Sequence, residues 1–437
     1  MSYTDRSEIE TPRDLYERWI AEIDEGLKVE RKWREQVRKV IKRFRDERDD
    51  SQRTRSKFNI LYSNIVTAKA AIYQQPPRPD VRRRFGGDDP VGKQVAEVIE
   101  RGLSYCIDDY DFDENVMASV DDYLMGGRGV LRIRYVPDVM ADEDEYGQEY
   151  ERLKFQRTGV EYVHWSDFLT SPAQRWDDVR WTAFRHLMTR EELEELNEEA
   201  APNVGLDYSL KADSGSEDED ELFKRAEVWE IWDKETRTVI WVSRGYELPL
   251  YIQADPLGLE GFFCVPEPLY GVMTTDTLIP VPEYALYQDL ADELDDITQR
   301  ISALTDALKV RGVYDSAVEE IAMMMEAEDG TLTPAENAAS LYDRGGIDSA
   351  IWFMPLDQIT ATLNQLYQAR ELVKQTIYEV MGISDLLRGA SDSSETATAQ
   401  RVKAQFGTMR LDAKKRQVQR FARDVLRLKA EILCEHF

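Results

Sequence analysis

The chain has 437 residues. This length exceeds the usual size of a domain with a single hydrophobic core, so we expect at least two substructures or an elongated molecule. Charged residues make up 32% of it, which is typical of long solvated helices and assembly subunits rather than of a compact enzyme. The net charge of −29 argues against a protein that binds nucleic acid tightly, because phosphate binding depends on many contacts from Lys and Arg side chains. An acidic surface that lines a passage would instead keep DNA from adhering to the wall. The alternative interpretation is that the net charge only keeps the protein soluble.

The cysteines and the N-terminus indicate the compartment. Cys106, Cys264 and Cys434 are widely separated and odd in number, so the sequence contains neither a disulfide framework nor a CxxC motif. The N-terminal residues are polar, and no apolar run approaches the length needed to span a bilayer. We therefore expect a soluble protein that is cytoplasmic when it is made.

Helices are predicted to dominate the first part of the chain. Two are expected within residues 1–57 from the spacing of the apolar positions. A third, apolar helix ends before Pro76 and Pro77, which cannot continue an α-helix. A fourth is expected around residues 95–110, and a fifth ends at the glycine cluster that begins with Gly126.

The middle of the chain predicts β structure. Alternating apolar residues begin a strand at Val130, and most of residues 130–281 has the pattern of strands and turns. The clearest hairpin is EVWEIWDKETRTVIWVS (residues 227–243), in which two aromatic and β-branched runs are joined through Asp233, Lys234 and Glu235.

From Pro282 the pattern returns to helices. Apolar residues recur at spacings of three and four between Leu286 and Leu308, which predicts one long helix with acidic residues on its other faces. Residues 311–355 form an irregular insert, and a second helix follows and ends at Gly382. Each helix of roughly 25 residues spans about 40 Å, so we expect a projecting helical hairpin with a small head.

The last part of the chain is a loop followed by a basic helix. The Gly and Ser content of residues 382–396 predicts a flexible connection, with Ser393, Ser394 and Thr396 capping the next helix. The basic helix could expose a solvated face, touch DNA, or pair with acidic parts of a neighbouring subunit. The acidic remainder of the chain favours pairing between subunits.

The sequence identifies no catalytic constellation. GDDPVGK (residues 87–93) has the glycine and lysine spacing of a phosphate-binding loop, but Gln94 replaces the magnesium-binding Ser or Thr, and Asp88 and Asp89 would repel a triphosphate. We interpret it as an exposed turn. No histidine lies at a metal-ligand spacing, and carboxylates are too abundant for a chance pair to indicate a two-metal nuclease. We therefore predict a non-enzymatic protein with no catalytic residue, cofactor or metal site.

The order of these parts resembles that of the portal proteins of tailed bacteriophages. NILYSNIVTAKAAIYQQPPRPDV (residues 59–81) looks like their N-terminal helix and Pro-rich exit. VHWSDFLTSPAQRWDDVRWTAFRHLMTREEL (residues 163–193) looks like their strand, loop and following helix, and residues 227–243 resemble their β-hairpin. The likeness covers nearly the whole chain and lies in the order of parts rather than in one signature motif.

The resemblance implies an α+β, mainly helical fold with an α/β wing, a two-helix stem, a small α/β clip, a tunnel loop and a long channel helix. In chain order, the parts are the wing (1–281, β-rich from about 130), the first stem helix (282–310), the clip (311–355), the second stem helix (356–381), the tunnel loop (382–396) and the channel helix (397–437). The chain stops soon after this last helix, so the crown found in many portals would be short or absent.

The resemblance also implies a function. Family members form a homo-oligomeric ring, a dodecamer, at one capsid vertex, through which double-stranded DNA is packaged and ejected. The ring would bind the terminase large subunit during packaging and the head–tail adaptor afterwards, and it would contact the major capsid and scaffolding proteins. The protein would then belong to the virion, and to the host cytoplasm during assembly, with no membrane partner.

The resemblance assigns four groups of candidate site residues. The tunnel-loop residues are Ser384, Asp385, Leu386, Leu387, Arg388, Ser391, Asp392, Ser393 and Ser394. The candidate acids of the channel wall are Asp292, Glu293 and Asp296. The candidate partner contacts in the clip are Met323, Met324, Met325 and Tyr342. The residues expected to pair subunits are Arg416, Arg420 and Arg423.

The sequence leaves two other classes of protein open. Another head–tail connector or capsid-associated structural protein would share the acidity and the self-assembly, but it would not need a helical hairpin with an inserted head. A DNA-packaging ATPase or nuclease would need a complete phosphate-binding loop or a defined metal site, and the sequence contains neither.

Overall fold

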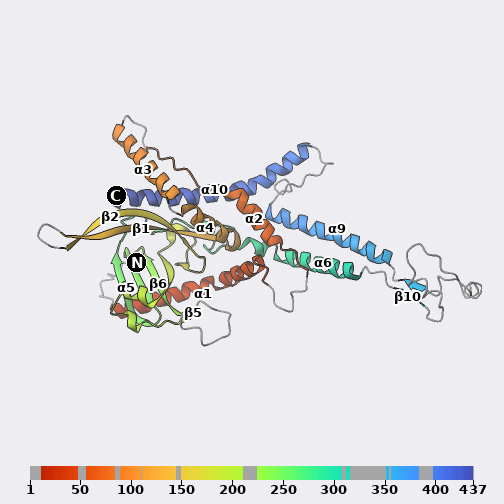
Figure 1. Cartoon of the computed structure of the whole chain (residues 1–437), viewed down its shortest axis with the longest axis horizontal. Coiled ribbons are helices and arrows are strands. Elements are labelled where there is room, and N and C mark those ends of the chain that lie inside the picture. Colours follow the sequence, from red (N-terminus) through yellow and green to blue (C-terminus); the bar gives the residue numbers. More distant parts are fainter. Residues whose placement is uncertain are drawn as a thin grey trace, which may run out of the picture. The chain divides into compact units, whose positions relative to one another are not determined.

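The protein has an α+β, mainly helical fold, as the sequence predicts (Figure 1). The computed structural model describes residues 11–47, 56–83, 89–109, 111–143, 149–209, 224–307, 312–314, 351–353, 356–382 and 397–436. Contacts divide the chain into two compact units. The first contains Met1–Glu47, Ile60–Leu286 and Met381–Phe437, and the second contains Arg48–Asn59 and Tyr287–Val380.

One long helix, α1 (Pro12–Phe44), begins the first unit and is capped by Thr11. The prediction of two helices within residues 1–57 is wrong, because one helix covers all the apolar positions on which it rested. The buried stripe of α1 continues through Gly26 and Glu30, which are not apolar and therefore interrupt the pattern in the sequence. The glycine allows a leucine of the neighbouring sheet to approach closely, and two buried arginines neutralise the carboxylate.

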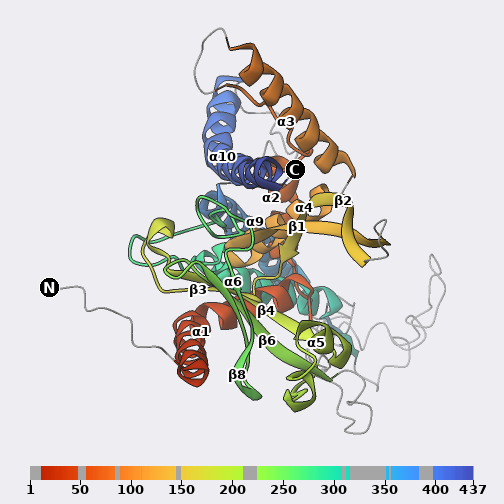
Figure 2. The same cartoon turned by 90° about the vertical axis from the view of Figure 1, so that its left-hand side faces the viewer.

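An antiparallel sheet lies against α1 (Figure 2). Its strands follow the order β3-β4-β6-β7-β8, with β5 beside β6. Their bounds are β3 (Phe168–Thr170), β4 (Trp181–Met188), β5 (Tyr208–Ser209), β6 (Lys224–Asp233), β7 (Thr238–Ser243) and β8 (Tyr246–Ala254). Trp19 and Ile23 of α1 pack with Trp181, Trp229 and Ile231 of the sheet, so aromatic burial joins the two layers.

Two motifs predicted for this sheet are confirmed. The strands β6 and β7 form the expected hairpin, in which Asp233 lies opposite Thr238. The expected order of strand, loop and helix in residues 163–193 is also present, since β3 is followed by a 3-10 turn at Trp176–Asp178, by β4 and by α5 (Arg190–Leu196).

A second sheet in the first unit is built on a long hairpin. Strands β1 (Arg128–Glu143) and β2 (Glu149–Val163) pair antiparallel, and β9 (Leu269–Tyr270) adds to the base of β1. Helix α4 (Phe112–Gly126) precedes β1 and ends at Gly127, whose φ of +83° favours glycine. The glycine cluster therefore ends a helix and begins a strand, as predicted.

Replacing Gly129 by alanine is expected to destabilise the first unit by about 1–3 kcal/mol, because a Cβ at this position would collide with the backbone of Ser119 in α4. Gly159→Ala on β2 is the matched control, since a Cβ there meets no atom of the described residues within 4 Å beyond its chain neighbours. It should gain about 0.4–1 kcal/mol. Urea denaturation measures both changes, and equal stabilities would show that the close approach of α4 does not require glycine.

Helices α2 (Ile60–Ile72) and α3 (Pro90–Asp109) both pack on the C-terminal helix α10 (Ala397–His436). Helix α2 ends before Pro76 and Pro77, as predicted. At 40 residues, α10 is about 60 Å long, so one helix connects several parts of the first unit.

Helix α3 begins inside the segment with the spacing of a phosphate-binding loop. The carboxylate of Asp89 accepts a hydrogen bond from the backbone N–H of Val91, at the helix N-terminus that a phosphate would need. Lys93 lies 3.9 Å from Glu97 on the same helix. The interpretation of the segment as an exposed turn is therefore wrong for residues 90–93, which are the first turn of α3, and residues 87–88 lie outside the described residues.

The second unit is a pair of helices joined through a small antiparallel sheet. Helix α6 (Gln288–Ala307) precedes β10 (Gly312–Tyr314), which pairs with β11 (Ile351–Phe353) at the other end of the insert. Helix α9 (Leu356–Met381) has the bounds predicted for the second stem helix. It ends at Gly382, with a φ of +67°, again as predicted.

The first helix of the pair begins later than predicted. We expected it from Pro282, but Glu283–Leu286 forms a 3-10 turn in which the N–H of Ala285 bonds to the carbonyl of Pro282. Leu286, which the pattern placed on the apolar stripe, is 53% exposed. The boundary between the two units follows this residue. The apolar spacing therefore begins in the 3-10 turn of the first unit and continues into α6 of the second unit.

Phe58 connects the two helices of the second unit. Its backbone N–H donates to Oδ1 of the buried Asp295 in α6 at 3.0 Å. The cationic groups of Arg370 and Lys374 in α9 lie 5.1 and 5.8 Å from the centre of its ring. Phe58, which the predicted division places with the first 281 residues, therefore lies by its contacts in the second unit.

Candidate functional site: an acidic helix face and a basic groove

The exposed face of α6 in the second unit is acidic. Asp292, Glu293 and Asp296, the predicted channel-wall acids, are all exposed. The apolar stripe lies on the opposite face, where the buried residues are Leu294, Ile297 and Ile301. The three carboxylates are one, three and four positions apart, so they form one anionic surface that repels phosphate.

Helix α9 carries large apolar side chains that its own unit leaves exposed. The predicted stripe is confirmed at Val373 and Ile377, which are buried, and wrong at Val380, which is exposed. The buried residues instead recur every four positions, at Val373, Ile377 and Met381, and Met381 is the last residue of the helix. Tyr367 and Leu372 are 47% and 69% exposed, and side chains of this kind suit contact with another molecule.

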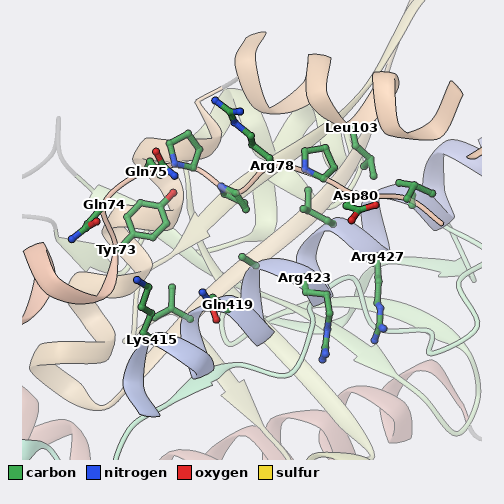
Figure 3. A pocket seen from close by; sticks show the side chains of 18 of the residues that line it. Tyr73, Gln74, Gln75, Arg78, Asp80, Leu103, Lys415, Gln419, Arg423 and Arg427 are labelled. Atoms are coloured by element: carbon green, nitrogen blue, oxygen red, sulfur yellow. The ribbon is translucent and has the colours of Figure 1, made fainter. Parts of the chain in front are cut away.

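A groove of about 1080 Å³ runs in the first unit between α10 and the Pro-rich segment that leaves α2 (Figure 3). The prolines keep this segment extended, because proline cannot enter the helix interior. The lining residues of α10 are three or four positions apart and share one helix face. The apolar lining includes Pro76, Pro77, Leu103, Val418, Ala422 and Leu426.

The groove is basic although the chain is acidic. Five of its charged lining residues are basic, and only Asp80, which is paired with Arg82 at 2.6 Å, is acidic. Figure 3 shows Lys415 reaching up from α10 into the groove. Arg423 and Arg427 lay their aliphatic stems along it and direct their guanidinium groups away from the Pro-rich segment. The groove therefore has an apolar floor, and three of its five basic residues are ion-paired, Arg82 with Asp80 and both Arg423 and Arg427 with Asp424.

The three arginines predicted to pair subunits lie on α10 in different surroundings. The guanidinium group of Arg420 donates to the carboxylate of Glu267 at 3.1 Å and to the carbonyl oxygen of Pro268 at 2.9 Å. Arg420 therefore fastens α10 to the segment before β9. Arg416 and Arg423 are exposed, so they are the two members of the set that face solvent.

The other predicted site residues lie outside the described residues. In the tunnel loop they are Ser384, Asp385, Leu386, Leu387, Arg388, Ser391, Asp392, Ser393 and Ser394. In the insert they are Met323, Met324, Met325 and Tyr342.

No family model matches this chain, and no curated protein matches it in sequence. Its function must therefore follow from the surfaces of its own residues. These are an anionic helix face in the second unit and a basic, apolar groove in the first.

A largely buried ion-pair network, which no pattern in the sequence predicted, joins β1 to the first sheet. Two nitrogen atoms of Arg132 donate to the carboxylate of Glu230 at 2.7 and 2.5 Å, and Nε2 of His186 lies 2.8 Å from the same carboxylate. Burial alone would raise the pKa of Glu230, but Arg132 and His186 lower it to about 2. The partners are up to 98 positions apart in sequence, so no local pattern could reveal them.

A second buried network joins Glu30 of α1 to Arg34 and Arg128, and both arginines also donate to the carbonyl oxygen of Phe168. Neither network lines the groove. Their carboxylates and guanidinium groups are buried, while His186 is partly exposed, so the buried charges hold distant elements of the first unit together. Within the described ranges, no group of three His, Cys, Asp or Glu residues could hold a metal ion. In the same part of the chain, no helix has the length and apolar character needed to cross a membrane.

Asp122 of α4 is a buried carboxyl group whose protonation is coupled to folding. Burial raises its pKa to about 7, although hydrogen bonds from the Tyr162 hydroxyl and the Trp165 backbone N–H oppose the shift. The folded protein therefore keeps this proton up to about pH 7, while the unfolded chain releases it near pH 3.8. Stability contributed by Asp122 consequently falls as the pH rises between these two values.

Asn at position 122 mimics the protonated acid and does not titrate. Between pH 5 and pH 7 the free energy of unfolding of the natural protein should therefore fall, relative to that of the Asp122→Asn variant, by up to about 1.4 kcal/mol for each pH unit. Urea denaturation of both proteins at the two pH values measures this change. Asp121→Asn is the control, because Asp121 is partly exposed and paired with Lys69 at 2.7 Å. A stability difference for Asp122→Asn that is independent of pH would contradict the prediction.

Proposed function

We propose that this chain is the subunit of a bacteriophage portal, a ring at one capsid vertex through which double-stranded DNA enters and leaves. The observation that carries the proposal is the second unit, in which two helices joined by an insert expose an acidic face. In this proposal α6 and α9 form the stem, the insert forms the clip, and α10 is the channel helix. The resemblance in the order of parts supports the same assignment.

An acidic stem suits a passage rather than a binding site. Helix α6, with 20 residues, is about 30 Å long, a length of duplex that carries about 18 phosphate charges. Lys and Arg at this surface would hold phosphates through counterion release, so DNA would bind and stop moving. Carboxylates such as Asp292, Glu293 and Asp296 instead repel the duplex from all sides and leave it free to slide.

The proposal also accounts for apolar side chains that the second unit leaves exposed. Tyr367 and Leu372 of α9 would be covered by the neighbouring copy in the ring, which we expect to be a dodecamer. The clip would bind the terminase large subunit and then the head–tail adaptor, while the wing would contact the major capsid and scaffolding proteins. The protein would hydrolyse nothing, because the terminase motor would supply the work.

Electron microscopy of the purified protein tests the proposal. Class averages should show rings with a central hole and about twelve-fold symmetry, and the rings should not hydrolyse ATP with or without DNA. A closed particle without a channel, or measurable nucleotide turnover by the purified protein, would overturn the proposal.

A further inference from the structure

The C-terminal half of α1 carries a basic surface on a chain whose net charge is −29. Its members are the exposed residues Lys32, Arg38, Lys39 and Lys42. None of the four forms an ion pair or a side-chain hydrogen bond with another described residue. Spacings of three, four and seven positions place them on one side of the helix, and the exposed acid between them, Glu35, is paired with Arg31 at 3.3 Å. This basic face of α1 therefore attracts an anionic partner.

The opposite charge is concentrated on α5 and the turn that follows it. Residues 191–199 contain six glutamates and no Lys or Arg. One of them, Glu192, caps α5 by accepting a hydrogen bond from the backbone N–H of Thr189. The other five are exposed and form no ion pair with a described residue, and they are Glu191, Glu194, Glu195, Glu198 and Glu199. Burial of Leu193 and Ala200 fixes this acidic α5 surface on the first unit.

Helices α1 and α5 lie on opposite sides of the first sheet (Figure 2). In strand β6, Trp229 and Ile231 pack with α1, whereas Val228 packs with Leu193 of α5. Successive residues of a strand point to opposite faces of the sheet. The sheet therefore lies between the two helices of one chain, and a contact between α1 and α5 requires a second copy.

A second copy suits the basic face of α1 better than a nucleic acid does. A duplex carries about one phosphate charge for each 1.7 Å of its length. It would extend beyond four cations onto a chain that has 85 acidic and 56 basic residues. The acidic α5 surface is limited to nine residues, so four cations nearly balance its five free carboxylates. A head-to-tail ring also needs two different, complementary surfaces on each copy, and this pair supplies them.

We propose that the basic face of α1 contacts the acidic α5 surface of the next copy. The inference rests on the proposed function in one respect, namely that copies associate head to tail. Each exposed ion pair contributes little affinity by itself. The contact instead steers the approach of two acidic subunits and selects their orientation, because other orientations bring like charges together.

Two charge-reversed variants test the contact. The first reverses the basic face by Lys32→Glu, Lys39→Glu and Lys42→Glu. The second reverses the acidic α5 surface by Glu194→Lys, Glu195→Lys and Glu198→Lys. All six positions are exposed, so folding should survive. Each variant alone should lose self-association by a factor on the order of 100, because like charges then face each other, and sedimentation velocity of the full chain measures the loss.

Mixing the two variants separates a direct contact from a general loss of assembly. In an equimolar mixture each reversed surface meets a reversed partner and each natural surface meets a natural one, so assemblies of alternating variants should form. A single chain with all six changes should also assemble again. The inference is overturned if the natural protein stays monomeric, if either variant alone assembles normally, or if the mixture and the six-change chain stay monomeric.

Control variants make matched charge reversals at other exposed positions of the first unit. The cation control combines Lys93→Glu, Arg101→Glu and Lys154→Glu. The acid control combines Glu97→Lys, Asp108→Lys and Glu114→Lys. Both controls should assemble like the natural protein. Duplex binding by the natural protein that the reversed α1 face abolishes would overturn the inference, because the basic face would then belong to a nucleic-acid contact.

These outcomes are separable from a failure of the proposed function. Channel-bearing rings formed equally well by both reversed variants would keep the portal proposal and remove the contact between α1 and α5. Complementing variants whose parent forms open filaments without a channel would keep the contact and remove the portal proposal. The variant with a reversed α5 surface should bind little DNA, since its α6 face stays acidic.

Discussion

Reversing the acidic face of α6 by Asp292→Lys, Glu293→Lys and Asp296→Lys is expected to turn an assembly that does not hold DNA into one that does. Three exposed lysines per copy, repeated around a duplex, would release counterions and bind non-specifically with a Kd on the order of 10⁻⁶–10⁻⁴ M. Fluorescence anisotropy of a labelled duplex at 50 mM salt measures the gain. The affinity of the variant should fall linearly with salt on a double-logarithmic plot.

A control with the same change in net charge separates the position of the acids from their number. Glu191→Lys, Glu194→Lys and Glu195→Lys reverse three exposed acids of α5 in the first unit. The proposal expects little DNA binding from this control, because α5 is not assigned to the channel wall. Equal binding by both triple variants would show that only total charge matters, and it would remove the special role of the α6 face.

Glu230→Ala is expected to destabilise the first unit by about 3–5 kcal/mol, because it leaves the buried guanidinium group of Arg132 without its counter-charge. Trp232 and His186 would lose their hydrogen-bond partner in the same change. Thermal and urea unfolding followed by tryptophan fluorescence measure the loss, since several tryptophans lie in the sheet that contains Glu230.

Two further variants identify the cause of that loss. Glu235→Ala, in the exposed turn of the same hairpin, should change the free energy of unfolding by less than about 1 kcal/mol. Combining Arg132→Met with Glu230→Leu should recover much of the stability, because no uncompensated charge stays buried. A double variant as unstable as Glu230→Ala would show that the lost packing, and not the unpaired charge, causes the destabilisation.

Local patterns in the sequence determined the elements that depend on neighbouring residues. The bounds of α9, the end of α2 before Pro76 and the β6–β7 hairpin all follow from periodicity and from proline and glycine at the ends. The apolar stripe of α6 could also be read from spacing at Leu294, Ile297 and Ile301, whereas the spacing did not show that Asp295 among the neighbouring acids is buried. A helix or hairpin of this kind repeats its signal every two to four residues, so one sequence suffices to find it.

Other features were decided only by the tertiary structure. Helix α1 runs unbroken through Gly26 and Glu30 because a distant strand packs on the glycine and buried arginines neutralise the acid. The groove beside α10 is formed by segments more than 300 positions apart, and the contact between Phe58 and Arg370 of α9 spans a similar separation. The charge and hydrophobicity of a residue indicate whether it needs a partner when it is buried. Only the folded chain decides which distant residue is that partner, because burial and charge pairing depend on proximity in space.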